Sequence, residues 1–185
     1  MRTPFLTMTA LAALVGLSAC GSLAAVSTYG SVAPNYHEND YATAGTNRDM
    51  WVVVVGSVPG SDAATLQQQT IATMQKNASI KTRFTTQPQN YKSEYKTVLL
   101  FNGADSVRSN DLCANPGSQK AGPASTDLRI HAVFCRYDQF LSETYASARG
   151  GNSLSNPNFE ALIRQTMTGI YHAAAEDRGP EMDDM

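Results

Sequence analysis

The sequence predicts an α+β fold, a two-layer sandwich in which a mostly antiparallel sheet of about five strands carries two helices on one face. Three observations favour it. Apolar β-branched runs recur between residues 50 and 148, and one amphipathic stretch follows the first run while another follows the last. The chain has 185 residues, of which about 165 follow an apolar leader. That length supports one domain rather than two.

The domain begins with a strand and a helix. Residues 50–55 form an unbroken apolar run, which is typical of a strand buried on both faces. A tight turn at residues 56–60 follows, and Ser61 or Asp62 can cap a helix that ends near Asn77. The apolar face of this helix comprises Ala63, Leu66, Thr70, Ile71 and Met74.

Four further strands are predicted at residues 81–86, 95–102, 128–135 and 140–148. The third of these alternates clearly, because every second residue points to the same side of a sheet. One face comprises Leu128, Ile130, Ala132 and Phe134, and the other comprises Arg129, His131, Val133 and Cys135. A turn at residues 137–139 joins the last two strands as an antiparallel hairpin.

The last helix has the clearest pattern in the chain. Ser155 or Asn156 can cap it, and Pro157 suits its first turn. Its apolar residues recur at helical spacing and are Phe159, Leu162, Ile163, Thr166 and Ile170. The predicted order is therefore β-α-β-β-β-β-α, within a domain that spans residues 50–175.

The two segments that flank this domain lack such periodicity. Residues 20–49 are rich in Ser, Ala, Gly, Asn and Thr, and they are predicted to be a flexible tether that spans about 30 Å on average. Residues 176–185 are acidic and lack apolar anchors, so we expect a disordered, solvated tail.

The first residues of the chain are typical of an export signal. Residues 5–17 are apolar but too few to cross a bilayer, which needs about 20 residues. They end in Leu17, Ser18, Ala19 and Cys20, a sequence that resembles the lipobox of bacterial lipoproteins. The resemblance implies that residues 1–19 are a removed signal peptide and that the Cys20 thiol carries lipid, as in the palmitate-bearing lipoproteins.

The resemblance extends to location. In enterobacterial lipoproteins an Asp after the lipidated cysteine favours retention at the inner membrane, and here Gly21 favours the periplasmic face of the outer membrane. The order of elements in residues 128–171 also resembles that of small Gram-negative envelope lipoproteins, and it carries over no functional residue. The alternative is a plain secretory signal cut after Ala24 or Ala25. An uncleaved anchor is disfavoured because the apolar run ends at Ser18.

The chain has three cysteines. If Cys20 carries lipid, Cys113 and Cys135 remain, and in an oxidising envelope they are predicted to form a disulfide. The bridge would close a loop of about 23 residues, which corresponds to roughly 3 kcal/mol of stabilisation. The alternative is a reactive thiol at one of these positions, which requires a neighbour that lowers its pKa.

No motif in the chain indicates catalysis, a metal or a cofactor. Residues 56–60 lack both the nucleophile-elbow and the phosphate-loop patterns, which leaves only a helix N-terminus that could receive an anion. His37, His131 and His172 are not at metal-ligand spacing. A Cys135–His131 nucleophilic pair is conceivable, although a disulfide would remove it.

Composition and motifs together favour binding over catalysis. The net charge is −2 with scattered Lys and Arg, which argues against a nucleic-acid partner. We therefore expect a lipid-anchored envelope protein with a structural or protein-interaction role, whose partners are the membrane and an envelope protein. The alternative is an accessory domain that holds a small ligand on the open sheet face. A hydrolase with a dispersed site, using carboxylates such as Asp138 and Glu143, is the least favoured.

Overall fold

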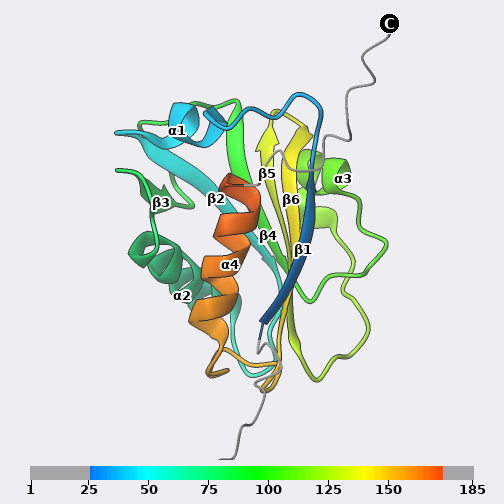
Figure 1. Ribbon diagram of the computed structural model, residues 1–185. Coiled ribbons are helices and arrows are strands. Elements are labelled where there is room, and N and C mark those ends of the chain that lie inside the picture. The colour runs from blue at the N-terminus through cyan, green and yellow to red at the C-terminus, as the bar shows by residue number, and fades with distance from the viewer. Residues whose placement is uncertain (1–25, 173–185) are drawn as a thin grey trace, which may run out of the picture.

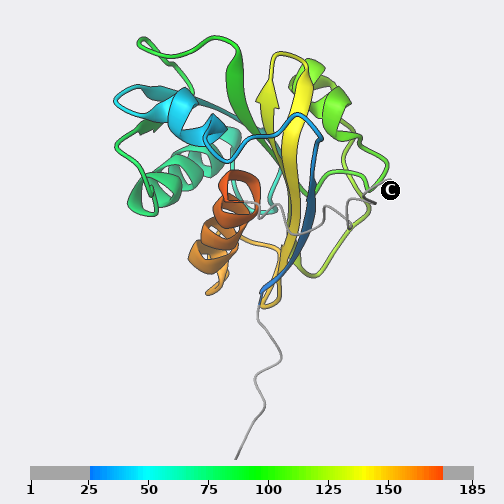
Figure 2. The same cartoon turned by 45° about the horizontal axis from the view of Figure 1, so that its top comes forward.

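The computed structural model describes residues 26–172, which form a six-stranded sheet with helices on both faces (Figures 1 and 2). The α+β class is confirmed, with one strand more than predicted and four helices instead of two. The strands are β1 (Val26–Val32), β2 (Asp49–Gly56), β3 (Arg83–Thr85), β4 (Tyr95–Phe101), β5 (Leu128–Arg136) and β6 (Gln139–Ala148). The helices are α1 (Asp40–Gly45), α2 (Ala63–Lys76), α3 (Ser109–Ala114) and α4 (Phe159–Tyr171), with a short 3-10 turn at Pro116–Ser118.

The sheet is mixed rather than mostly antiparallel. Its order is β1-β6-β5-β4-β2-β3, and β2 runs parallel to both β3 and β4 while the remaining pairs are antiparallel. The reason is the crossover through α2, which returns the chain to the end of the sheet where β2 began. Sequence pattern identifies the strands and does not by itself give their relative direction.

The prediction of a flexible tether over residues 20–49 is wrong from Val26 onward. Residues 26–32 form β1, which pairs with β6 from Val26 opposite Ala148 to Val32 opposite Ser142. The segment that follows buries Tyr36 and Tyr41 in the core. The predicted signal peptide, the lipidated Cys20 and the acidic tail at residues 176–185 lie outside the described residues.

Helices α2 and α4 pack on one face of the sheet, as the amphipathic patterns predict (Figure 1). Helix α2 begins after Asp62, whose carboxylate accepts a hydrogen bond from the Thr65 amide at 2.7 Å. The Asp62 carboxylate therefore occupies the helix N-terminus at which the sequence analysis considered an anion. Helix α4 begins later than predicted, because Asn156 instead shapes the preceding loop by accepting a hydrogen bond from the Asn158 amide at 2.8 Å.

Helix α3 lies on the opposite face, in a segment for which the sequence predicted no regular structure (Figure 2). A disulfide joins Cys113 of α3 to Cys135 of β5, the two cysteines that the sequence pairs. Both cysteines are fully buried, in a second apolar cluster with Val98, Leu100 and Val133. The bridge therefore holds a six-residue helix, too short to be stable alone, against the sheet.

Tyr171, the last residue of α4, joins both ends of the described chain in the core. It is only 1% exposed, and its ring stacks on Tyr41 with centroids 4.0 Å apart. Its hydroxyl lies 2.6 Å from Thr97 Oγ1, and its carbonyl accepts a hydrogen bond from the Tyr36 hydroxyl at 3.2 Å. Burial raises the pKa of the Tyr171 phenol well above its ordinary value.

We expect Tyr171→Phe to lower the free energy of unfolding by about 1–3 kcal/mol, because it leaves the buried Thr97 hydroxyl without its partner. Denaturant unfolding with the disulfide intact measures this change. The matched control is Tyr137→Phe, which alters a side chain that is 69% exposed and should stay within about 0.5 kcal/mol. Equal effects of the two variants would contradict the role given to Tyr171.

Candidate functional site

The face of the sheet that carries α3 presents a group of polar and aromatic side chains beside the second apolar cluster. We call it the α3 face. Alternation brings side chains from three neighbouring strands to it, because pairing keeps residues in register across β1, β6 and β5. These side chains are Ser27, Tyr29 and Ser31 from β1, Glu143, Tyr145 and Ser147 from β6, and Arg129 and His131 from β5.

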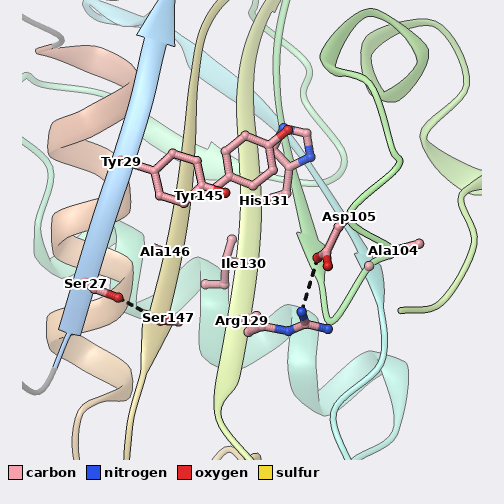
Figure 3. A pocket seen from close by; sticks show the side chains of 11 residues that line it. Ser27, Tyr29, Ala104, Asp105, Arg129, Ile130, His131, Tyr145, Ala146 and Ser147 are labelled. Carbon is pink, nitrogen blue, oxygen red and sulfur yellow. Dashed lines mark hydrogen bonds and ion pairs between the residues drawn. The ribbon is translucent and has the colours of Figure 1, made fainter. Parts of the chain in front are cut away.

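Three aromatic rings form a row across these strands (Figure 3). Tyr29 stacks on Tyr145 with centroids 4.9 Å apart, and Tyr145 stacks on His131 at 3.9 Å. Exposure falls along the row, from 71% for Tyr29 at the sheet edge to 7% for His131. We call these residues the aromatic row. Burial raises the pKa of the central Tyr145 phenol, and the nearby charge of Glu143 adds to the effect.

A pocket of about 180 Å³ lies beside the aromatic row (Figure 3). Asp105 and Arg129 form an ion pair in its lining, with Arg129 Nη1 at 3.2 Å from the carboxylate. Ser27 and Ser147 hydrogen-bond at 2.8 Å elsewhere in the lining. Arg129 Nε is buried without a hydrogen-bond partner among residues 26–172. The lining of the pocket therefore combines an aromatic wall with a charged pair.

Ser109, His131 and Glu143 form a polar cluster where α3 meets the sheet. The Ser109 hydroxyl donates to Glu143 Oε2, and its oxygen lies 3.2 Å from His131 Nε2. The same ring nitrogen lies 3.4 Å from Glu143 Oε2. Ser31 of β1 donates to the other carboxylate oxygen at 2.6 Å. The cluster thus connects α3 to three adjacent strands.

These residue types occur in nucleophilic triads, but their arrangement differs from one. In a triad the serine approaches one ring nitrogen of the histidine and the carboxylate holds the other. Here Ser109 and Glu143 both approach Nε2, and the serine proton goes to the carboxylate rather than to the imidazole. The geometry accounts for the cluster as a fastening between α3 and the sheet.

The cluster holds Glu143 in its ionised form. The hydrogen bond from His131 is the largest effect, and burial opposes it while the bonds from Ser109 and Ser31 add to it. Together they lower the pKa of Glu143 from 4.5 to about 2. The α3 face therefore keeps a negative charge near the base of the aromatic row at neutral pH.

The structure separates several residues that the sequence considered together. Cys135 is bonded to Cys113, so the alternative of a Cys135–His131 nucleophilic pair, or of a reactive thiol at either cysteine, is wrong. Asp138 lies in the exposed hairpin turn and forms an ion pair with Lys96 at 3.8 Å, apart from the cluster that holds Glu143. His172 Nε2 lies 2.9 Å from Ser79 Oγ.

Within residues 26–172, no group of three or more His, Cys, Asp or Glu side chains could hold a metal ion. In the same part of the chain, no helix is long and apolar enough to cross a bilayer.

Sequence reasoning singled out His131 and missed its partners. The hairpin of residues 128–148 carried a usable signal, because its register places Glu143 and Tyr145 on the same face as His131. Ser109 had no such signal, since it reaches the cluster from a helix of six residues. Tyr29 was assigned to the tether, and its place in the aromatic row follows only from the pairing of β1 with β6.

Comparison with known proteins places the chain in no family. No protein-family model matches the sequence, and no curated protein matches it. Among solved structures, the fold is similar to the PelC dodecamer from Paraburkholderia phytofirmans, with a TM-score of 0.44 and 7% identity over 79% of this chain and 98% of that one. A point variant of the same dodecamer gives a TM-score of 0.43 and 9% identity, over 78% and 95% of the two chains.

We expect Glu143→Gln to make stability less dependent on acid. Because the pKa of Glu143 is lowered in the folded state, its stabilisation is complete above pH 4.5 and is lost as the pH falls toward about 2. The variant should be about 2 kcal/mol less stable at pH 7, and its stability should decline less steeply between pH 4.5 and 2. Denaturant unfolding across this pH range measures both effects.

The matched control is Asp138→Asn, which removes an exposed carboxylate and should leave the pH profile nearly unchanged. Some acid dependence should remain in Glu143→Gln, because the hydrogen bonds from Arg83 lower the pKa of Asp49 as well. Parallel pH profiles for the wild type and Glu143→Gln would contradict the role given to the cluster.

Proposed function

We propose that this protein is a lipid-anchored cell-envelope protein, attached through Cys20, whose domain has a structural or protein-interaction role. The observation that carries the proposal is the use of the cysteines. Two of the three form the Cys113–Cys135 disulfide, and the third stands at the lipobox position after an apolar leader. A structural disulfide also favours an oxidising compartment such as the periplasm.

Because residues 26–49 belong to the domain, an anchor at Cys20 would hold the domain closer to the membrane than the sequence predicts. Strand β1 begins at Val26, six residues after Cys20. Six residues span at most about 20 Å when fully extended, in place of the longer tether expected from the sequence. The domain would therefore stay close to the membrane surface, and a protein partner would have to meet it there. Gly21 favours the periplasmic face of the outer membrane as that surface.

The α3 face supports binding rather than group transfer. Its serine and histidine are engaged with Glu143 within one cluster, while the aromatic row leaves Tyr29 largely exposed. Tyrosine is common at protein interfaces, because it offers a rigid apolar ring together with a hydroxyl. A protein-interaction role would use the exposed ring of Tyr29.

A second candidate function is the holding of a small envelope molecule in the pocket beside the aromatic row. The observation that favours it is the composition of the pocket, whose lining combines the rings of Tyr29, His131 and Tyr145 with the ion pair between Asp105 and Arg129. A ligand with a planar or apolar ring and a polar or charged group would complement both features.

Lipidation is tested by growing cells with an alkyne analogue of palmitate. The wild-type chain should be labelled, Cys20→Ser should lose the label, and globomycin should cause a larger precursor to accumulate. The control is the double variant Cys113→Ser/Cys135→Ser, which keeps Cys20 and should keep the label. Labelling that survives Cys20→Ser would overturn the anchor.

The second candidate is tested by native mass spectrometry of protein released gently from envelopes. We expect a bound small molecule on the wild type and none on Ala104→Phe, because a phenyl ring at this position in the lining fills the pocket. The control is Ala72→Phe on the exposed face of α2, which should keep the adduct. An adduct of equal abundance on all three proteins would rule out this pocket as its site.

A further inference from the structure

Strand β1 is an edge of the sheet that lacks the usual protection. Among residues 26–172 it pairs with β6 alone, in an unbroken register of seven residues. Its sequence, VSTYGSV, contains neither a charged residue nor a proline. Natural proteins commonly guard such edges with lysine, proline, a bulge or a very short strand. The opposite edge follows that practice, because β3 has three residues and begins with Arg83.

The sequence of β1 is nearly the same in both directions. Around the central Tyr29, Ser27 corresponds to Ser31 and Val26 to Val32. If β1 lay antiparallel to a second β1 about a two-fold axis at Tyr29, each valine would face a valine and each serine a serine. Such self-complementarity is what an isologous two-fold interface requires.

One pair of residues in β1 does not match across the two-fold axis, and packing within the domain explains the mismatch. Thr28 would face Gly30 of the second copy rather than another threonine. A Cβ atom at residue 30 would overlap the carbonyl oxygen of Glu143 on β6, so glycine is required there by packing within the domain. The single mismatch therefore has a cause unrelated to the outer edge of the strand.

The aromatic row ends at this edge. Tyr29 is its last ring and is 71% exposed, while its inner face stacks on Tyr145. A two-fold axis normal to the sheet keeps each face of the sheet on the same side in both copies. Tyr29 would then lie beside Tyr29 of the second copy, so that the two aromatic rows become continuous. Cross-strand aromatic pairs of this kind stabilise antiparallel sheets.

We propose that β1 pairs antiparallel with β1 of a second copy of this chain, about a two-fold axis at Tyr29, and joins two six-stranded sheets into one. Charge permits this pairing, because the strand is uncharged and the nearby Glu143 is already bonded to His131 and Ser31. The proposal goes beyond the function proposed above, and the lipid takes no part in the strand pairing itself, although anchoring would raise the local concentration of the chain.

The chain outside the structure is compatible with the pairing. The two copies of Val26 would leave the paired strands at opposite ends, about 20 Å apart. A span of six residues from each to its Cys20 lets both lipids reach one membrane when the axis stands normal to it. A pair of seven-residue strands is a small interface, so the full chain should be tested in the envelope, where anchoring raises its local concentration.

The first test uses Tyr29→Cys in the full chain, treated in intact cells with a short thiol-to-thiol crosslinker. Because position 29 lies on the axis, we expect a covalent band of twice the monomer mass. The control is Tyr137→Cys, whose parent side chain is 69% exposed in the hairpin turn, against 71% for Tyr29. Tyr29→Cys should give about tenfold more dimer, because pairing brings its thiols to millimolar effective concentration.

The second test fixes the register. Ser27→Cys and Ser31→Cys, carried on chains with different tags in the same cells, should crosslink to each other far more than either does to itself. Adding Tyr29→Lys to both chains should abolish the crosslink, since it places two ammonium groups on the axis, and adding Tyr29→Phe should preserve it.

The proposal is overturned if Tyr29→Cys crosslinks no more than Tyr137→Cys, or if Ser27→Cys crosslinks to itself as well as to Ser31→Cys. It is also overturned if the crosslinked product has the mass of a different protein. Lipidation is read separately by the palmitate label, so failure of the anchor and failure of the pairing give different results.

Discussion

The buried phenol of Tyr171 is the contact on which the arrangement of the domain depends. Its ring packs against Tyr41 from the N-terminal segment, Phe84 from β3 and Phe134 from β5. Its hydroxyl also holds the hydroxyl of Thr97 in the centre of the sheet. Because the cost of burying a tyrosine hydroxyl is recovered only when its partner is in place, this bond favours one position of α4 on the sheet, and stacking on Tyr41 adds the N-terminal segment to the same contact.

That constraint reaches the edge of the sheet. The carbonyl groups of the last turn of α4 accept hydrogen bonds from Ser142 of β6 and from Tyr36, which follows β1. The end of α4 therefore also fixes β6 and the segment that follows β1. The aromatic row depends on the register between β1 and β6, and it lies on the face of the sheet opposite Tyr171 and its aromatic neighbours.

Sequence pattern succeeded where an element buries a continuous apolar face. Residues 50–55, the hairpin of residues 128–148 and the helix that ends at Tyr171 all have such a face, and the structure places each within a few residues of its predicted bounds. It failed for β1, whose five central residues are exposed, because an edge strand half covered by one neighbour has no strong hydrophobic alternation. It failed for α3 because a helix of six residues is too short to show a period.

The site was less predictable than the fold for a similar reason. The sequence places His131 on a strand face. Its role in the structure comes from its contacts with Ser109 and Glu143, which lie on other elements. The contact with Glu143 follows from the register of a hairpin that the sequence predicts, whereas the contact with Ser109 depends on how α3 packs on the sheet, which residue types near His131 do not encode. The disulfide could be predicted because the argument needed only the number of cysteines and an oxidising compartment.

Formation of the disulfide also affects when the α3 face becomes complete. Ser109 lies one helical turn before Cys113, so the bond that secures α3 to β5 also delivers the serine hydroxyl to His131 and Glu143. A chain in a thiol-reducing compartment lacks that bond, and its short helix is then held by the buried Leu112 side chain and the hydrogen bonds of Ser109 and Asn110. The α3 face is therefore most firmly fixed only after the two cysteines have been oxidised.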